Sequence, residues 1–504
     1  MKIGIEIFDQ TVESELAVLR ILRSENRWFT TEEISELSKL NTTQTLKILK
    51  RLISDMEAFG TDYMEVFFSK GKGARFVTKR ADANPRKFLI FLVEETIGFN
   101  LFTAIYNEDY TSASNFAMEH FVSDATVRRQ LNKFRTSIQP LGLDLSRSDA
   151  ILTGEETQIR LFLNMALWKI YAGEGWPFEG VSEQRMEYIA ENILTHSDLN
   201  VTPIQKRQLV FLLAIGIIRR RNNHFIECKE SWHELIQNNE SFTHFKTLIS
   251  PFASFSESHP GEIAFLFFLL IIQSENIQII KFLEKNFEEN KKNNTVVYRA
   301  TEKLEEKLQK YIAPVPEELH KVFLLNAFSY HLFAHIFHNF STDLNGYDYS
   351  IIIDSPFGNP ILTHLKSNIQ ELIKELRTET NFSLFQEENY LISKYGLLFS
   401  LLNAQTSFEP LIKIKISTDL PFLVNLRLKE RISTVFKDSY NIEFLDASES
   451  NHGDILLTNI TLPRDGPEYK QVRIAFINRI LTFRNIIMLN QNLYELSQEK
   501  KEDK

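Results

Sequence analysis

Cysteine is almost absent from this chain, because Cys228 is the only one among 504 residues. One thiol excludes a disulfide framework and any zinc site built from several cysteines. The first residues also lack the charged and then apolar pattern of a secretory leader. We therefore expect a cytoplasmic protein that stays in a reducing compartment.

Catalytic signatures are missing as well. The sequence contains no G-x-x-x-x-G-K-[ST] phosphate loop, no G-x-S-x-G nucleophile turn and no dinucleotide-binding glycine pattern. Glycine is scarce, at 17 residues, whereas phenylalanine is abundant, at 41. This balance favours packed helices over nucleotide-binding loops. We predict that the chain is not an enzyme and holds no cofactor and no metal.

A long apolar segment is also lacking. The longest such run, residues 263–272, is far shorter than the roughly 20 residues that a membrane span needs. We expect this run to form a buried helix, and we expect no membrane contact. With 43% hydrophobic and 24% charged residues, the composition is that of a globular chain long enough for several domains.

Positive charge is not in excess, because the formal net charge is −9. Two stretches, residues 70–80 and 125–143, nevertheless contain basic residues and no acid. Local basic clusters in an acidic chain suit a narrow footprint on nucleic-acid phosphates. The clusters comprise Lys70, Lys72, Arg75, Lys79 and Arg80 in the first stretch, and Arg128, Arg129, Lys133 and Arg135 in the second.

Residues 29–53 have the pattern of a helix, a tight turn and a second helix. Thr30 and Glu33 form a capping-box pattern at the start of the first helix of this pair. Residues 13–23 have helical periodicity and predict another helix in front of the pair. The front of the chain is therefore expected to be a three-helix unit.

The helix after the turn is the candidate recognition helix, since one side is apolar and the other is polar and basic. We expect Leu46, Leu49 and Ile53 to face the core. Residues 64–69 and 75–78 predict a basic hairpin, as in the wing of a winged helix. The alternative is a plain three-helix core with a solvated charged face. The side left for DNA comprises Thr43, Gln44, Lys47, Lys50 and Arg51.

Residues 111–134 repeat this design, and a short hairpin is expected directly after them. Ser123 can cap the second helix of the pair, and Val127, Leu131 and Phe134 form its apolar stripe. Two such units in tandem favour binding to double-stranded DNA over two unrelated solvated helices. The outward side of the second helix comprises Thr126, Arg128, Arg129 and Lys133.

A family resemblance is carried by the run FVSDATVRRQLNKF and by the junction of Gly154, Glu155, Ile159 and Arg160. This region resembles the second helix-turn-helix of the Mga and AtxA family of Gram-positive regulators and their relatives with PTS regulation domains. The order of the predicted parts is similar over most of the chain. The resemblance implies a transcriptional (virulence) regulator that the sugar phosphotransferase system (PTS) controls through its phosphocarrier protein.

Residues 160–400 carry helical periodicity with few breakers. The polar stretch EENKKNN, residues 288–294, is suited to a linker between two halves of similar length. The pair Asn359 and Pro360, followed by an apolar helix, is similar to the PTS regulation domains of the same family. The resemblance therefore implies two helical regulatory domains.

Histidine is the residue that would carry control in such domains, because a neutral imidazole nitrogen can accept a phosphoryl group near neutral pH. By position, His196 is the candidate in the first domain and His331 is the candidate in the second. Further candidates are His224, His335 and His364. The alternative for each is an ordinary packed or surface histidine.

Three rival interpretations stay open. A zinc-dependent enzyme could use His331, His335 and His338, whose i, i+4, i+7 spacing predicts one helical face, although no Glu completes an H-E-x-x-H pattern. An RNA-binding antiterminator also uses paired PTS regulation domains, but it would need a small β domain at its front. A scaffold could use winged helices for protein contacts alone.

The last hundred residues predict a small parallel α/β domain, which resembles enzyme IIB proteins of the same transport system. Ser417 and Thr418 stand where those proteins carry a phosphorylated cysteine, so the resemblance implies dimerisation and not phosphotransfer. We expect Glu443 to be solvated and residues 499–504 to be disordered. Strands are expected at 411–417, 442–445 and 454–457, and helices at 423–436 and 474–493.

Together these patterns predict a mainly α, multidomain chain that binds double-stranded DNA, the PTS phosphocarrier protein and a second copy of itself through its C-terminal domain. The expected domains are a winged helix-turn-helix (1–85), a second, Mga-type helix-turn-helix (86–160), two PTS regulation-like domains (161–288 and 289–405) and an enzyme-IIB-like α/β domain (406–504).

Overall fold

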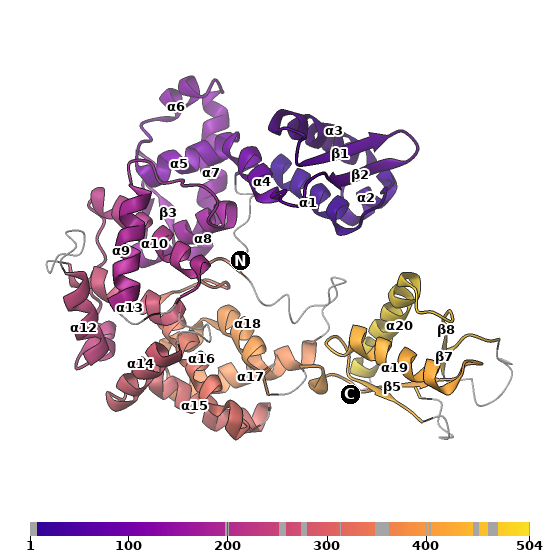
Figure 1. The fold of residues 1–504 in the computed structure, drawn as a ribbon. Coiled ribbons are helices and arrows are strands. Elements are labelled where there is room, and N and C mark those ends of the chain that lie inside the picture. Colours follow the sequence, from indigo (N-terminus) through magenta and orange to yellow (C-terminus); the bar gives the residue numbers. More distant parts are fainter. Residues whose placement is uncertain are drawn as a thin grey trace. The chain divides into compact units, whose positions relative to one another are not determined.

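The structure is a computed structural model, and Figure 1 shows it as a ribbon. It describes residues 8–196, 199, 201–250, 259–273, 280–312, 314–347, 362–399, 401–402, 405–446, 453–461 and 472–502. Twenty α-helices lie in these ranges, which confirms the mainly α class. The chain divides into two compact units, one formed by Met1–Thr295 with Ile336–Tyr347 and the other by Val296–His335 with Asp348–Lys504. The finer division into five domains stays a prediction.

The front of the first unit contains the expected helices and hairpin, in the order that is typical of a winged helix. The predicted capping box of Thr30 and Glu33 is present, and Lys39 ends the second helix in the left-handed conformation. Gly73 anchors the hairpin, because an added Cβ would lie 1.9 Å from the carbonyl oxygen of Phe29. The elements are α1 (Gln10–Ser24), α2 (Thr31–Ser38), α3 (Thr42–Phe59), β1 (Met64–Ser69) and β2 (Gly73–Thr78), with β1 and β2 antiparallel.

The buried side of α3 differs from the predicted stripe. Leu49 is buried as expected, but Leu46 and Ile53 are only half-buried. Helix α3 packs against both α1 and α2. Its buried face is therefore wider than the predicted stripe, and Leu46 lies at the margin of that face. The buried residues of α3 are Thr45, Ile48, Leu49, Leu52 and Met56.

The second helix-turn-helix pattern is also present. Ser123 caps its second helix, since the Ser123 hydroxyl accepts the N–H of Thr126 at 3.1 Å. Val127 and Phe134 are buried, whereas Leu131 of the predicted stripe is half-buried and Ile138 takes its place in the core. The elements are α4 (Pro85–Glu94), α5 (Ile97–Asn107), α6 (Ala113–Glu119), α7 (Asp124–Ile138), β3 (Asp144–Leu145), β4 (Leu152–Thr153) and α8 (Glu156–Tyr171).

The rest of the first unit is helical. The prediction that residues 288–294 form a linker is wrong, because α14 continues through Lys292. Only a turn at Asn293 and Asn294 follows this helix. Asn286 and Asn290 of this helix are buried and bond to backbone carbonyls one turn back, so the polar composition does not mark an exposed segment. The helices are α9 (Glu183–His196), α10 (Pro203–Arg221), α11 (Glu230–Ile236), α12 (Glu240–Ile249), α13 (Pro260–Gln273) and α14 (Ile280–Lys292).

The apolar run 263–272 lies in α13 and is buried on all sides, as predicted. Among the described helices, none alone has the length and apolar character to cross a membrane. One pair, α4 and α5, meets that criterion jointly, but it bends by 80° at its break.

The second unit begins with four helices. Of these, α17 packs against both α15 and α18. Residues 358–360, which carry the predicted Asn-Pro signal, lie outside the described residues. The helices are α15 (Val296–Tyr311), α16 (Glu317–Ile336), α17 (Thr363–Thr380) and α18 (Glu388–Phe399).

The C-terminal part of the second unit is the predicted small α/β fold, with all four strands parallel in the order β6-β5-β7-β8. Two predictions fail here. Residues 474–476 pair with β7 as a fourth strand instead of starting the last helix, and residues 499–502 are helical and not disordered. The elements are β5 (Ile412–Ile416), α19 (Phe422–Phe436), β6 (Ile442–Phe444), β7 (Ile455–Thr458), β8 (Arg473–Phe476) and α20 (Phe483–Glu502).

Candidate nucleic-acid interface

The outward side of α3 is exposed at all five predicted positions, namely Thr43, Gln44, Lys47, Lys50 and Arg51. Lys47 and Lys50 lie about one turn apart and, within the described chain, take part in no ion pair and no side-chain hydrogen bond. Both ammonium groups are therefore available to phosphates.

Two residues of this side also have structural roles. The Gln44 side chain accepts the N–H of Asn41 at 3.1 Å and completes a capping box that starts α3. Arg51 Nε lies 2.6 Å from the Glu15 carboxylate on α1 and 3.4 Å from Asp55. Gln44 and Arg51 thus stabilise the fold in addition to facing solvent.

Only some of the basic residues of the hairpin are available to contact phosphates. Arg75 donates to the Asn26 side chain at 3.0 Å, Lys79 pairs with Glu65, and Arg80 pairs with Asp82. The remaining basic residues, Lys70 and Lys72, flank the turn between β1 and β2, and in the described structure their side chains have no polar partner. The tip of the hairpin is therefore its cationic part.

In the second helix-turn-helix unit, α7 presents Arg128 and Arg129 to solvent. Arg128 pairs with Asp124 at 2.7 Å one turn earlier, an exposed contact that is worth little in water. Thr126 and Lys133 are half-buried, and the Thr126 hydroxyl lies 2.9 Å from the capping hydroxyl of Ser123. The two arginines are therefore the most available groups of this set.

Arg135, which the sequence places in the same basic cluster, holds the short hairpin. Its guanidinium lies 2.9 Å from the Asp144 carboxylate and donates to the Leu145 carbonyl at 3.2 Å. The guanidinium also keeps the pKa of Asp144 low, together with the Leu145 N–H, which is the larger cause. Arg135 is thus a structural residue.

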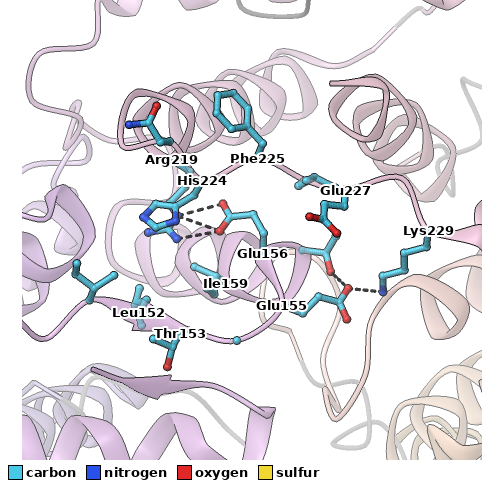
Figure 2. A pocket seen from close by; sticks show the side chains of 15 residues that line it. Leu152, Thr153, Glu155, Glu156, Ile159, Arg219, His224, Phe225, Glu227 and Lys229 are labelled. Atoms are coloured by element: carbon cyan, nitrogen blue, oxygen red, sulfur yellow. Dashed lines mark hydrogen bonds and ion pairs between the residues drawn. The ribbon is translucent and has the colours of Figure 1, made fainter. Parts of the chain in front are cut away.

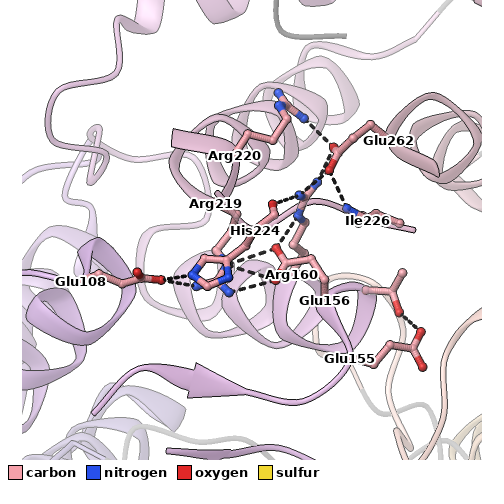
Figure 3. A network of polar contacts seen from close by, with 10 residues as sticks. Glu108, Glu155, Glu156, Arg160, Arg219, Arg220, His224, Ile226 and Glu262 are labelled. Atoms are coloured by element: carbon pink, nitrogen blue, oxygen red, sulfur yellow. Dashed lines mark hydrogen bonds and ion pairs between the residues drawn. The ribbon is translucent and has the colours of Figure 1, made fainter. Parts of the chain in front are cut away.

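A buried ionic network lies where α8, α10 and α13 meet (Figure 3). The Glu262 carboxylate accepts two hydrogen bonds from Arg160, both at 2.7 Å, and one from Arg220 at 2.7 Å. The Ile226 N–H adds a fourth at 2.9 Å. Burial acts to raise the pKa of Glu262, but Arg160 outweighs it and holds that pKa below its usual range. The carboxylate is therefore charged and fully paired.

The network continues to the second helix-turn-helix unit through Arg219, which is completely buried. Its guanidinium lies 2.9 Å from Glu156 at the start of α8 and 2.9 Å from Glu108 at the end of α5. His224 Nε2 also approaches Glu108, at 2.6 Å. One carboxylate of the helix-turn-helix segment thus receives both a buried arginine and a histidine from the end of α10 (Figure 3).

Arg160, Arg219 and His224 stand out in the sequence, whereas no sequence motif pointed to Glu108 or Glu262. The signal for Glu262 is a lone acid in the apolar helix Pro260–Gln273, since such a position needs a buried cation. The basic run after residue 218 supplies one of its two cations, Arg220, and α8 supplies the other, Arg160.

A cavity of about 600 Å³ lies beside this network (Figure 2). Its walls are β4, the first turn of α8 and residues 223–229, and His224 lines it with Arg219 and Phe225. The His224 side chain is 29% exposed. Lys229 pairs with Glu155 at the wall. His224 therefore combines a carboxylate partner with access from solvent.

The other candidate histidines differ in how far solvent reaches their side chains. His331 is completely buried, with Nδ1 2.8 Å from the Thr301 hydroxyl and Nε2 2.6 Å from the Tyr395 hydroxyl. Burial lowers the pKa of His331 to about 3. His364 lies 3.1 Å from Glu409 and is partly exposed, and His335 is half-buried. The side chain of His196 lies outside the described residues.

The predicted three-histidine face is wrong. Helix α16 ends at Ile336, so His338 does not continue the face of His331 and His335. Within the part of the chain that the structure describes, no group of three or more metal-ligating side chains is found. The three histidines therefore do not share one helical face, as the zinc-enzyme interpretation required.

In the C-terminal sheet, Thr418 lies just beyond β5, and its hydroxyl donates to the Asn425 side chain at 2.6 Å. Glu443 is half-exposed, as expected, with only a distant contact to Lys413 at 3.8 Å. The front of the chain holds helices and a two-stranded hairpin, not the β domain that an antiterminator would need.

Comparison with known proteins bears on the same region. Residues 83–167 match the model of the Mga helix-turn-helix domain. The chain is 22% identical over 240 residues to the capsule synthesis positive regulator AcpB of Bacillus anthracis, covering 47% of this chain and 46% of that protein. It is 23% identical over 267 residues to the anthrax toxin expression trans-acting positive regulator of the same organism, covering 51% and 54%.

These relatives are named as regulators, in agreement with the prediction that the chain is not an enzyme. The chain spans about half the length of the curated relatives it matches.

We predict that Glu262→Gln lowers the free energy of unfolding of the first unit by about 3 kcal/mol or more, because two buried guanidinium groups lose the carboxylate that they share. Urea unfolding followed by tryptophan fluorescence measures this, since Trp168 lies on α8 and Trp232 contacts Phe268 of α13. The matched control is Glu13→Gln, which removes an exposed partner of Arg20 and should cost less than about 1 kcal/mol. Equal losses in the two variants would contradict the assignment.

Proposed function

The chain belongs with the Mga- and AtxA-like transcriptional regulators through its Mga helix-turn-helix domain, and from this premise we propose that it binds double-stranded promoter DNA. The observation that carries the proposal is the pairing of a basic, exposed helix face with a helix-turn-helix in two successive units. In the first helix-turn-helix unit this face is on α3, and in the second helix-turn-helix unit it is on α7. The residues proposed to contact DNA are Thr43, Gln44, Lys47, Lys50, Arg51, Thr126, Arg128, Arg129 and Lys133.

Few cations are available, so their positions matter. Lys47 and Lys50 lie on α3, which packs against β1, and Lys70 and Lys72 lie at the tip of the hairpin that β1 begins, so the unit has a basic helix and a basic wing. A chain of net charge −9 repels DNA outside such a footprint. We infer a specific and strongly salt-dependent complex, not general adhesion to DNA.

We expect the double variants Lys47→Ala/Lys50→Ala and Arg128→Ala/Arg129→Ala each to weaken DNA binding about tenfold or more. Each lost phosphate contact should reduce the slope of log affinity against log salt by about 0.9. Fluorescence anisotropy with a promoter duplex between 50 and 200 mM salt, roughly the range in which counterion release dominates, measures both.

The matched control is Lys366→Ala/Lys374→Ala, which removes the same charge from the exposed side of α17. If all three double variants bind like the parent at every salt concentration, the assignment of the two helix faces is wrong. A scaffold that uses these units only for protein contacts would give that result.

We further propose that histidine phosphorylation by the PTS phosphocarrier protein regulates this binding, and that His224 is the best-placed acceptor among the described side chains. His331 cannot receive a phosphoryl group in this conformation, because both ring nitrogens are bonded and the ring is sealed from solvent. His224 lines an open cavity and contacts Glu108 of the helix-turn-helix segment.

The contact with Glu108 suggests how the signal would act. His224 Nε2 faces the Glu108 carboxylate at 2.6 Å as an ion-pair contact and not as a hydrogen bond, and we assign the lone pair of Nδ1 as the nucleophile. A P–N bond forms there as the P–N bond of the carrier breaks, and the carrier imidazole takes back the electron pair. The new phosphoryl charge lies close to Glu108 and Glu156, so repulsion weakens the junction between α10 and the DNA-binding segment.

Mass spectrometry under conditions that preserve phosphohistidine tests this after incubation with the phosphorylated carrier. We expect label on His224 and none on His331, and loss of most label in His224→Ala but not in the control His364→Ala. Label on His196 or His331 alone would contradict the choice of His224. Absence of label on all five candidates would contradict control by the carrier.

We also propose that the C-terminal α/β part forms a homodimer. Because β5 and β8 are parallel strands of one sheet, the helices that follow them start at the same edge. Large apolar side chains are exposed there, which is typical of an interaction surface. They are Phe422, Leu423, Ile480 and Phe483, exposed by 77%, 69%, 72% and 63%.

We expect Phe422→Asp/Ile480→Asp to raise the dimer dissociation constant by roughly two orders of magnitude, since a buried charge would replace an apolar contact. Sedimentation equilibrium of the full chain measures it. Val435→Asp, on the same helix α19, is the control and should leave the mass unchanged. A monomeric parent, or equal behaviour of both variants, would contradict this surface.

A further inference from the structure

We propose that Glu15 and a DNA phosphate compete for Arg51, so that DNA binding by the first helix-turn-helix unit takes up one proton when the carboxyl of Glu15 is ionised. This inference rests on the proposed DNA-binding function and adds a regulatory property to it. In the free protein Arg51 pairs with a carboxylate beneath the recognition helix. In the complex Arg51 moves to a phosphate, and Glu15 keeps a proton in its place.

The geometry sets up the competition. Glu15 lies on α1 with a side chain that is 0% exposed, whereas Arg51 is 46% exposed on α3. Their closest atoms, Arg51 Nε and Glu15 Oε1, are 2.6 Å apart. Arg51 lies on the flank of the helix side that carries Lys47 and Lys50, so rotation of its long side chain turns the guanidinium from Glu15 toward that side.

Among the residues that the structure describes, Arg51 is the one cation paired with this carboxylate. The charged groups around Glu15 are Arg51 and Asp55 on α3 and Asp9 at the start of α1, and two of these three are acids. In the described chain no ion pair or side-chain hydrogen bond joins Glu15 to a charged group of α2, β2 or α4. Departure of Arg51 therefore leaves a buried carboxylate that must be neutral.

The carboxyl titrates close to neutrality. Burial raises the pKa of Glu15 to about 8, Arg51 acts in the opposite direction, and Asp55 and Asp9 act in the same direction as burial. Below pH 8 the protonated acid releases Arg51 easily. Above pH 8 the ionised carboxylate retains it. Loss of Arg51 to DNA raises the pKa of Glu15 further, so above pH 8 the complex binds one more proton than the free protein.

The pH dependence of the DNA dissociation constant follows from the thermodynamic linkage between DNA binding and proton uptake. DNA affinity is nearly constant below pH 7 with respect to this group and falls as the pH rises through 8. For one proton and a free-protein pKa of about 8, the dissociation constant rises about tenfold between pH 7 and pH 9. Lysine and arginine stay charged over most of this window.

The test measures the dissociation constant of the full chain for a mixed-sequence DNA duplex of about 30 base pairs by fluorescence anisotropy, at one low salt concentration, from pH 7 to pH 9. We expect the parent to weaken about tenfold. Glu15→Gln should bind at pH 9 as tightly as the parent does at pH 7, with no slope. Arg51→Gln should bind more weakly than the parent, and its dissociation constant should also be independent of pH. This second variant keeps the test valid even if Glu15→Gln does not fold.

Two controls separate this inference from the proposed function. Glu57→Gln removes an exposed acid of α3 and should keep the full pH slope, and Arg128→Ala/Arg129→Ala should bind more weakly with the slope unchanged. A parent that binds equally at pH 7 and pH 9, or a slope that persists in Arg51→Gln, overturns the competition alone. Absence of DNA binding in the parent at every pH overturns the competition and the proposed function together.

Discussion

The charge of Glu262 is the constraint on which the first unit depends. A carboxylate in the middle of an apolar helix must be matched, and it obtains two guanidinium groups and one backbone N–H. These partners come from α8, from the end of α10 and from the segment after α10, so the requirement determines where three parts of the chain meet. Good packing alone would allow these helices to slide, whereas directional hydrogen bonds to a buried ion do not.

The same meeting point joins the DNA-binding part to the helical part. Arg219 shares its guanidinium between Glu156 and Glu108, and Glu108 belongs to the helix-turn-helix segment. Any change at the exposed edge of this cluster, where His224 lies, therefore acts on a carboxylate that already holds a buried cation. This arrangement explains how regulation proposed for the helical region could reach α7 without a long path.

Glu15 shows the opposite use of a buried carboxylate. Glu262 has a full set of partners and stays charged, whereas Glu15 has one cation, and two acids lie near it. The first arrangement makes a rigid junction and the second makes a group that gains or loses a proton near neutral pH. Burial is common to both, and the number of cationic partners decides between stability and response.

Periodicity, caps and turn residues were sufficient to predict most local elements, because those signals depend on neighbours within a few residues. The capping box of Thr30, the cap at Ser123, the hairpin after Met64 and the parallel sheet are examples. Errors arose where the tertiary environment outweighs local polarity. Residues 288–292 are helical, and the buried asparagines of this helix bond to backbone carbonyls, whereas residues 474–476 form a strand because β7 offers an edge. Tertiary structure likewise decides which cations can contact DNA. Arg135 and Arg51 form ion pairs with Asp144 and Glu15, whereas Lys47 and Arg129 form no ion pair in the described structure. Local chemistry therefore specified the helices and their capped ends, whereas only three-dimensional packing settled which charged groups are paired, because a partner's distance in space cannot be read from its distance along the chain.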